Sequence, residues 1–242
     1  MKTTGEQNIE IMIPQLFCFS HAGGTAEFFD EIGKDLPQVE LVKIEYAGHG
    51  VRRKEPFYAD YSELTKDVIR IVESNYRGDS YGLFGYSMGA ITLVEILKQI
   101  IQEGCIPVPK HVFLAAHEPH TKKELQGFSS EELDDWVKQR TIRFGDIPET
   151  LIDNRPFWRT YLPVYRADYS LISSYSFERL NLQTSIAATV FYSETDTPYE
   201  DMKGWKDYFQ GECVFQKYDG NHFFIRNHHQ EMADLIRDGL NA

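Results

Sequence analysis

The feature that most constrains this chain is a five-residue segment, Gly-Tyr-Ser-Met-Gly at residues 85–89, which has the pattern G-x-S-x-G. This pattern is typical of a sharp turn between a strand and a helix, where a strained serine exposes its hydroxyl. Glycines two positions before and after the serine relieve the crowding of such a turn. Residues 81–84 resemble a short buried strand, and residues 90–104 carry apolar side chains at helical spacing. We therefore expect Ser87 to be a nucleophile.

Short apolar segments alternate with helical patterns along most of the chain, without an internal repeat or an obvious linker. This alternation predicts an α/β fold, with a mostly parallel central sheet and helices on both faces. The 242 residues, 42% of them hydrophobic, are enough for one such domain over residues 1–242. We expect strands at residues 15–20, 39–45, 81–84, 111–116, 187–193 and 212–218, and body helices at 25–36, 60–75, 90–104 and 224–240.

The alternation is interrupted at about residues 118–175, where no convincing strand pattern occurs. Three helices are predicted there instead, at residues 129–143, 149–161 and 163–175, and Ser129 begins a capping-box sequence. An insertion of this length between strands often covers an active site. We therefore expect a helical lid, which its many aromatic side chains would also anchor to the body.

A serine hydroxyl needs a base to take its proton and an acid to orient that base. In folds with a nucleophile turn of this kind, the acid and then the histidine follow the serine along the chain. His222 directly follows the last predicted strand, and Asp196 lies in the loop after the preceding one. Glu194 and Asp201 are the competing acids. We predict that Ser87, Asp196 and His222 form a catalytic triad.

The tetrahedral intermediate of acyl transfer needs hydrogen-bond donors for its oxyanion. One donor is expected from the backbone N–H of Met88, the residue after the nucleophile. The second is expected from the glycine-containing loop after the first strand, residues 20–24, where Ala22 is the best-placed donor. A phosphate-binding loop is the competing interpretation, but the chain lacks both common glycine-rich phosphate motifs in this segment.

Composition excludes several other classes of function. The chain has 25 Lys and Arg against 37 Asp and Glu, a net charge of −12, so a general nucleic-acid binder is not expected. No apolar run approaches the length of a membrane span, and the polar N-terminal segment does not resemble a signal peptide. The three cysteines form neither a metal-ligand spacing nor a disulfide framework. We expect a cytoplasmic protein without a bound metal.

Five short segments occur together in this chain: Phe-Ser-His-Ala-Gly-Gly at 19–24, Tyr-Ala-Gly-His-Gly at 46–50, the nucleophile segment at 85–89, Arg-Ala-Asp-Tyr at 166–169, and Gly-Asn-His at 220–222. Together they resemble the type II thioesterases, stand-alone α/β-hydrolases that serve nonribosomal peptide and polyketide synthases. The resemblance runs nearly end to end. Departures at Ser20, Tyr46, Ala47, Ser193 and Asn221 concern loops and remove no reacting group.

The resemblance implies hydrolysis of acyl or aminoacyl thioesters on the phosphopantetheine arm of acyl or peptidyl carrier proteins, with no cofactor. It implies release of stalled or mis-primed arms by Ser-His-Asp covalent catalysis, and we expect a monomer. One alternative is a small-molecule carboxylesterase or lipase with the same triad. The others are a product-releasing thioesterase domain of a synthase and a non-catalytic binding protein on a hydrolase fold.

Carrier proteins of this kind are usually acidic, so a chain of charge −12 needs local basic or apolar surface to bind them. The densest basic run is Arg52, Arg53 and Lys54, directly after the Gly-His-Gly loop. Lys122 and Lys123 lie near the start of the predicted lid. We hypothesise that one or both of these basic segments bind the carrier, although a solvated loop is the simpler interpretation.

Overall fold

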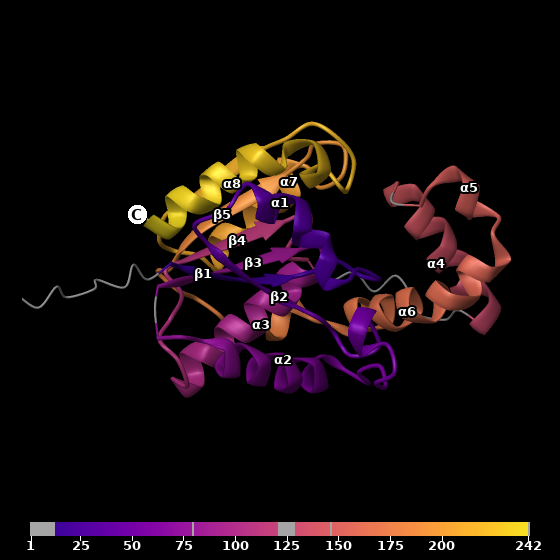
Figure 1. The fold of residues 1–242 in the computed structure, drawn as a ribbon, viewed down its shortest axis with the longest axis horizontal. Coiled ribbons are helices and arrows are strands. Elements are labelled where there is room, and N and C mark those ends of the chain that lie inside the picture. The colour runs from indigo at the N-terminus through magenta and orange to yellow at the C-terminus, as the bar shows by residue number, and fades with distance from the viewer. Residues whose placement is uncertain (1–12, 79, 121–128, 146, 242) are drawn as a thin grey trace, which may run out of the picture.

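The computed structural model describes residues 13–78, 80–120, 129–145 and 147–241. Its centre is a six-stranded sheet in the order β2-β1-β3-β4-β5-β6, in which all neighbouring strands are parallel (Figure 1). The predicted α/β class and parallel sheet are therefore confirmed. The strands are β1 (Gln15–Phe19), β2 (Glu40–Ile44), β3 (Tyr81–Tyr86), β4 (His111–Ala115), β5 (Ala187–Tyr192) and β6 (Cys213–Lys217).

Helices cover both faces of the sheet, as the apolar strands require. Figure 1 shows α1 (Asp30–Lys34) and α8 (Ile225–Asn241) on one face, and α2 (Tyr61–Asn75) and α3 (Met88–Glu103) on the other. Alternate residues of β1 pack into two apolar cores, one on each face of the sheet. Phe17 and Phe19 pack in the core with α2 and α3, whereas Leu16 and Cys18 pack in the core with α1 and α8. The short elements of the body are η1 (Ala26–Phe29), η2 (Gly50–Arg52), η3 (Phe177–Arg179), α7 (Tyr199–Met202) and η4 (Lys203–Asp207).

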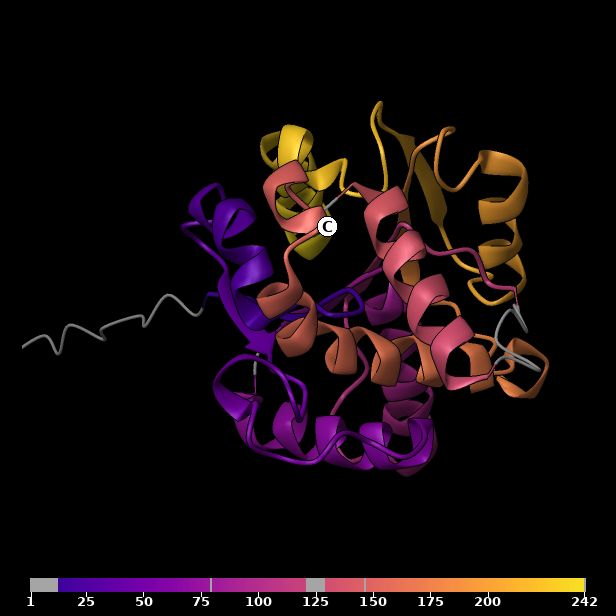
Figure 2. The ribbon, with the colours of Figure 1, turned by 90° about the vertical axis from the view of Figure 1, so that its right-hand side faces the viewer.

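A helical insertion lies between β4 and β5, consisting of α4 (Ser130–Phe144), α5 (Glu149–Ile152) and α6 (Arg155–Ser174). Figures 1 and 2 show it over one end of the sheet, where α4 and α6 cross the body. The expected capping box begins α4: the Ser129 backbone N–H donates to Glu132 at 2.8 Å, and the Glu132 N–H donates to Ser129 Oγ at 3.3 Å. Gly145, with a φ of 84°, ends this helix.

One predicted boundary in the insertion is wrong. The sequence predicts separate helices at residues 149–161 and 163–175, but α6 continues through Pro163, and only the short α5 precedes it. A proline inside a helix removes a backbone hydrogen bond and costs about 3 kcal/mol. Packing offsets this cost, because Trp158, Tyr165 and Tyr169 of α6 join Val137 of α4 in a separate apolar cluster.

Within the ranges that the structure describes, no helix is both long and apolar enough to cross a membrane.

Candidate active site

The segment at residues 85–89 forms the sharp turn between β3 and α3. Ser87 has φ 55° and ψ −118°, a strained conformation for a residue other than glycine. A Cβ on Gly85 would lie 2.3 Å from the carbonyl oxygen of Gly89, and one on Gly89 would lie 1.9 Å from that of Phe19. Only glycine fits at these two positions, and the turn therefore presents the Ser87 hydroxyl above the carboxyl end of β3.

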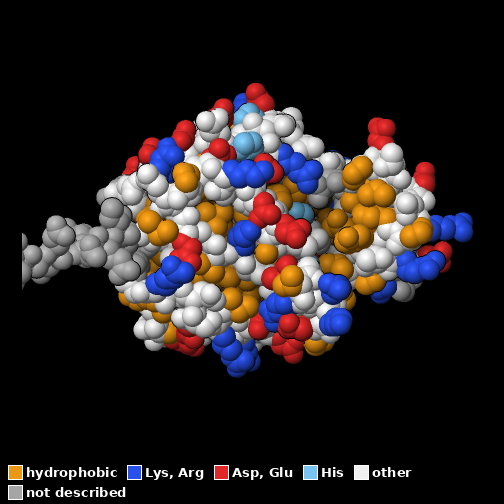
Figure 3. Space-filling model, in the orientation of Figure 1, with side chains coloured by type: hydrophobic (Ala, Val, Ile, Leu, Met, Phe, Trp, Pro, Cys, Tyr) orange, Lys and Arg blue, Asp and Glu red, His pale blue; other side chains and the backbone are white. Residues whose placement is uncertain are grey.

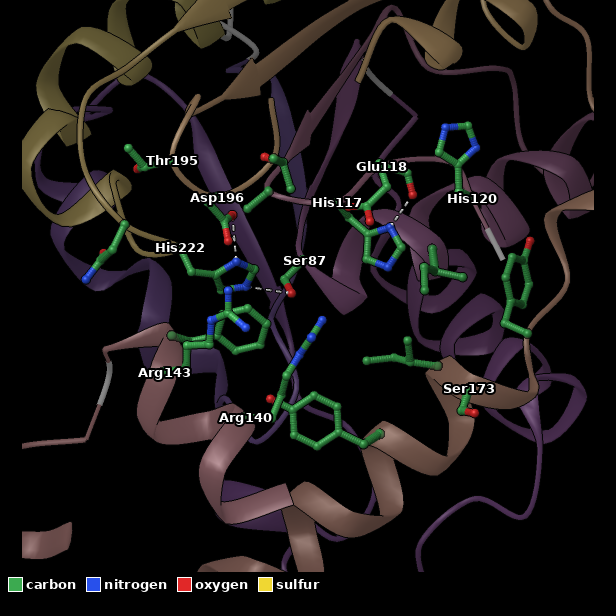
Figure 4. Close-up of a pocket in the computed structure, with 18 of the residues that line it drawn as sticks. Ser87, His117, Glu118, His120, Arg140, Arg143, Ser173, Thr195, Asp196 and His222 are labelled. Carbon is green, nitrogen blue, oxygen red and sulfur yellow. Dashed lines mark hydrogen bonds and ion pairs between the residues drawn. The ribbon is translucent and has the colours of Figure 1, made fainter. Parts of the chain in front are cut away.

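The structure brings Ser87, His222 and Asp196 into one line of hydrogen bonds (Figure 4). The Ser87 hydroxyl donates to Nε2 of His222 at 2.9 Å, and Nδ1–H of His222 donates to Oδ2 of Asp196 at 2.8 Å. Ser87 and His222 are buried, and Asp196 is partly buried. This is the geometry in which an imidazole can take a proton from a serine while a carboxylate fixes its tautomer.

The acid and histidine loops are held together by hydrogen bonds. The hydroxyls of Ser193 and Thr195 both donate to the carbonyl oxygen of Gly220, each at 2.5 Å. The Tyr86 hydroxyl donates to the carbonyl oxygen of His222 at 2.7 Å. These contacts fix the two loops after β5 and β6 against the turn after β3. The acid that faces His222 is Asp196, whereas Glu194 and Asp201 are exposed.

The loop after β1 lies beside the nucleophile, as the oxyanion-hole prediction requires. Ala22, Ser87 and His222 together line a small cavity, and Ala22 is buried. Met88 is the first residue of α3, so its N–H lies at the positive end of the helix dipole. The positions of Ala22 and Met88 are compatible with two donors to an oxyanion, and that role stays a prediction.

A cavity of about 400 Å³ opens in front of Ser87, between the body and the insertion. Figure 3 shows apolar side chains on the insertion beside the hollow that separates it from the body. The lining combines apolar side chains with polar or charged ones: Ile91, Trp136, Phe144, Tyr169, Ile172 and Phe177, and then Glu118, His120, Arg140 and Arg143. A cavity of this size and mixed lining suits a small organic acyl group.

Over residues 13–78, 80–120, 129–145 and 147–241, no three His, Cys, Asp or Glu side chains are grouped to hold a metal ion. Burial raises the pKa of the Cys213 thiol to about 11, and burial raises that of Cys18 as well. Both sulfurs are therefore thiols near neutral pH, and a thiol is a poor nucleophile.

The family of this fold follows from comparison with known proteins. A family model described as a thioesterase domain matches residues 14–240. The chain belongs to the thioesterase domain family. This thioesterase is 26% identical over 216 residues to the medium-chain S-acyl fatty acid synthase thioesterase of Rattus norvegicus. The alignment covers 87% of this chain and 81% of the relative. It is 24% identical over 225 residues to the gramicidin S biosynthesis protein GrsT of Aneurinibacillus migulanus, in an alignment that covers 92% of this chain and 87% of GrsT.

A solved structure agrees with the fold of the thioesterase. The type II thioesterase BorB from the borrelidin biosynthetic cluster superposes with a TM-score of 0.80 at 23% identity, covering 96% of this chain and 94% of that one. The fold is thus that of the α/β-hydrolase thioesterases. The family resemblance predicted from the five sequence segments is confirmed.

The thioesterase site also contains residues that the sequence did not predict. The Phe144 ring, at the end of α4, stacks on the His222 imidazole, with centroids 4.0 Å apart. The Arg140 guanidinium lies 4.9 Å from the centre of the Phe144 ring, and Figure 4 shows Arg140 and Arg143 reaching from the insertion toward Ser87. An aromatic ring on the imidazole limits its movement and shields it from water. No motif or spacing marks Phe144, because the contact depends on how the insertion docks.

The proposed docking residues have different environments. Arg52 is paired within its loop and with α2, since its guanidinium donates to Glu55 of the loop at 2.5 Å and to Asp67 of α2 at 2.7 Å. Arg53 and Lys54 are exposed. Lys122 and Lys123 lie outside the described residues. Within the first basic segment, Arg53 and Lys54 are left as the docking candidates, because the charge of Arg52 is already paired.

Proposed function

We propose that this thioesterase hydrolyses acyl or aminoacyl thioesters held on the phosphopantetheine arm of a carrier protein. The observation that carries the proposal is the hydrogen-bonded line of Asp196, His222 and Ser87, which opens on a cavity of about 400 Å³ beneath the helical insertion. An acyl group fits the cavity, and the thioester carbonyl would lie at the Ser87 hydroxyl.

The names of the relatives support a carrier-bound substrate. One relative is a fatty acid synthase thioesterase, another is a gramicidin S biosynthesis protein, and the structural neighbour BorB is a type II thioesterase from the borrelidin biosynthetic cluster. Synthases of these kinds hold their intermediates as thioesters on carrier proteins. A hydrolase that acts on such carriers would free arms that hold a wrong or stalled acyl group.

The geometry supports a two-step covalent mechanism. Ser87 Oγ attacks the thioester carbonyl while His222 Nε2 takes the hydroxyl proton, and Asp196 stabilises the imidazolium that forms. The tetrahedral oxyanion accepts from the N–H groups of Ala22 and Met88. The C–S bond then breaks, His222 gives its proton to the leaving thiolate, and an acyl-serine ester remains. Water, activated by His222, attacks this ester and releases the free acid and Ser87.

The proposal is tested with a panel of carrier proteins loaded with different acyl and aminoacyl groups. Each is incubated with the protein, and the mass of the carrier arm is measured before and after. We expect the loaded mass to convert to that of the free arm for at least one acyl class, with kcat/KM well above that for a p-nitrophenyl ester of the same acyl group. A preference for the p-nitrophenyl ester would favour the carboxylesterase alternative instead.

The basic segment in the loop between β2 and α2 offers a surface for the carrier. Arg53 and Lys54 are exposed in the loop between β2 and α2, and Val51 and Phe57 add exposed apolar surface beside them. Figure 3 shows basic side chains at the place where Figure 1 shows this loop, next to α6. We propose that acidic side chains of the carrier bind here, because the chain as a whole, at −12, repels them.

Charge reversal tests this docking surface. The double variant Arg53→Glu/Lys54→Glu is expected to raise KM for a carrier-bound thioester about tenfold, a cost of about 1.4 kcal/mol, while KM for a small thioester stays unchanged. The matched control is Lys110→Glu, an exposed lysine just before β4, at the opposite end of the sheet from Ser87. Equal effects of the double variant on both substrates, or an equal effect of the control on the carrier, would contradict docking at this loop.

A further inference from the structure

Two of the sequence segments that carry the family resemblance contribute a residue with no part in the proposed reaction: His49 in the Gly-His-Gly loop and Asp168 in the Arg-Ala-Asp-Tyr segment. In the structure these two side chains meet. We propose that the His49–Asp168 pair positions the oxyanion loop, holding the Ala22–Gly23 peptide so that the Ala22 N–H faces the reacting carbonyl. This inference rests on the proposed function, because it assigns positioning residues to that same site.

The pair joins three segments that are far apart in the sequence. Oδ2 of Asp168, on α6, lies 2.9 Å from Nε2 of His49, in the loop after β2. The same oxygen accepts the backbone N–H of Gly23, in the loop after β1, at 2.6 Å. The side chains of His49 and Asp168 are only 2% and 3% exposed. Water therefore competes little for these bonds, and the three segments are linked at one carboxylate oxygen.

The surroundings of His49 favour its protonated form. His49 Nδ1 lies 3.0 Å from the carbonyl oxygen of Ala47, and a carbonyl only accepts, so this nitrogen carries a proton. Nε2 faces a carboxylate, which also accepts. Burial by itself lowers the pKa of His49, but the charge and hydrogen bond of Asp168 raise it, and the pKa lies above its usual value. Both ring nitrogens of His49 thus face acceptors, an arrangement that favours the protonated ring.

The Ala22–Gly23 peptide is held from both sides. Asp168 accepts its N–H, and Nδ1 of His21 lies 3.0 Å from its carbonyl oxygen. Gly23 adopts a φ of 75°, and a Cβ there would lie 2.0 Å from the Tyr165 ring. The plane of this peptide is therefore fixed by contacts on each edge. The Ala22 N–H lies in the preceding His21–Ala22 peptide, whose plane joins this one at the Ala22 Cα. Fixing the Ala22–Gly23 plane therefore restricts the direction of the proposed oxyanion donor.

Asp168 also makes the oxyanion loop depend on the helical insertion. Trp158, Tyr165 and Tyr169 of α6 pack with α4 in the apolar cluster of the insertion, whereas Asp168 reaches into the body. Docking of α6 therefore supplies the acceptor that orients the loop after β1. A buried carboxylate is suited to this task because hydrogen bonds to charged groups are stronger than those between neutral groups.

The test compares Asp168→Ala with Asp134→Ala, which breaks an ion pair between Asp134 of α4 and Arg166 of α6 without touching the oxyanion loop. With a short-chain N-acetylcysteamine thioester as substrate, we expect Asp168→Ala to lower kcat about 10- to 100-fold and to leave KM within about threefold, since losing one oxyanion donor costs about 10²- to 10³-fold. Asp168→Asn, which keeps an acceptor oxygen, should have a kcat between that of Asp168→Ala and that of the wild type. The control should keep its kcat.

Two inhibitors distinguish a positioning role of Asp168 from a general loss of structure at the active site. A trifluoromethyl ketone analogue of the substrate forms a tetrahedral oxyanion adduct with Ser87, whereas a thioether analogue has no carbonyl to bind the oxyanion hole. We expect Asp168→Ala to weaken binding of the ketone by the same factor by which it lowers kcat/KM, and to leave the affinity for the thioether unchanged. Equal weakening of both inhibitors, or unchanged affinity for the ketone, would overturn the proposal.

His49 provides an independent test if Asp168→Ala does not fold. His49→Gln keeps an N–H donor near the position of Nε2, and His49→Ala removes it, so His49→Gln should retain more kcat and more ketone affinity. If both His49 variants bind the ketone like the wild type, the positioning role is wrong. All comparisons are ratios to the wild-type enzyme on a small thioester. A wild type that fails on carrier-bound substrates would contradict the proposed function and leave these ratios to decide the positioning role.

Discussion

Ser87→Ala is expected to lower kcat for thioester hydrolysis by about 10⁵-fold or more, because triad serines act as a unit with their base and acid. The substitution removes the hydroxyl that donates to His222 Nε2 at 2.9 Å. Binding should survive, since the cavity lining is otherwise unchanged. Single-turnover hydrolysis of a loaded carrier, followed by mass spectrometry, gives the rate, and the wild type alone should accumulate an acyl-enzyme.

The matched control is Ser173→Ala, which removes a hydroxyl from the lining of the same cavity. It should change kcat by less than about tenfold, because its loss removes no reacting group and only alters substrate contacts. Thermal unfolding of both variants should resemble that of the wild type. Hydrolysis by Ser87→Ala at the wild-type rate, with the correct mass and fold, would show that Ser87 is not the nucleophile.

Much of the architecture could be predicted because its causes are local. Strands buried on both faces appear as continuous apolar runs, as in β1 and β4, and the residues of these strands fall within the predicted ranges. The capping box at Ser129 needs only residues three positions apart. The turn at Ser87 is determined by glycines whose side-chain space is filled by nearby backbone. The contact between Asp196 and His222 follows from topology, since these residues lie in the loops after two neighbouring parallel strands, β5 and β6.

Other features could not be predicted because they depend on tertiary packing. Continuation of α6 through Pro163 depends on the aromatic cluster that this helix forms with α4. The stack of Phe144 on His222 and the contact between His49 and Asp168 join residues from separate segments. Sequence resemblance marked the segments that contain His49 and Asp168, but it did not indicate that they touch. Pairing of Arg52 with Asp67 likewise appears only once the loop and α2 are placed together.

Asp196→Asn is expected to lower kcat by about 10⁴-fold with a smaller change in KM, because a carboxamide can leave the His222 ring in the wrong tautomer. In the structure, Nδ1–H of His222 donates to Oδ2 of Asp196 at 2.8 Å, which leaves Nε2 free to accept the Ser87 proton. A side-chain NH₂ group facing Nδ1 would instead favour the proton on Nε2, and the base would be lost. Steady-state kinetics on a small thioester measures the effect.

Two neighbouring acids provide controls that decide between the three candidates. Glu194→Gln and Asp201→Asn each neutralise an exposed carboxylate close in sequence to Asp196, and neither should lower kcat by more than about threefold. A large loss in Glu194→Gln with a small one in Asp196→Asn would transfer the orienting role to Glu194. Because all three variants remove one negative charge from the same region, a shared electrostatic effect would lower kcat equally in all three. Only hydrogen bonding to Nδ1 of His222 singles out Asp196.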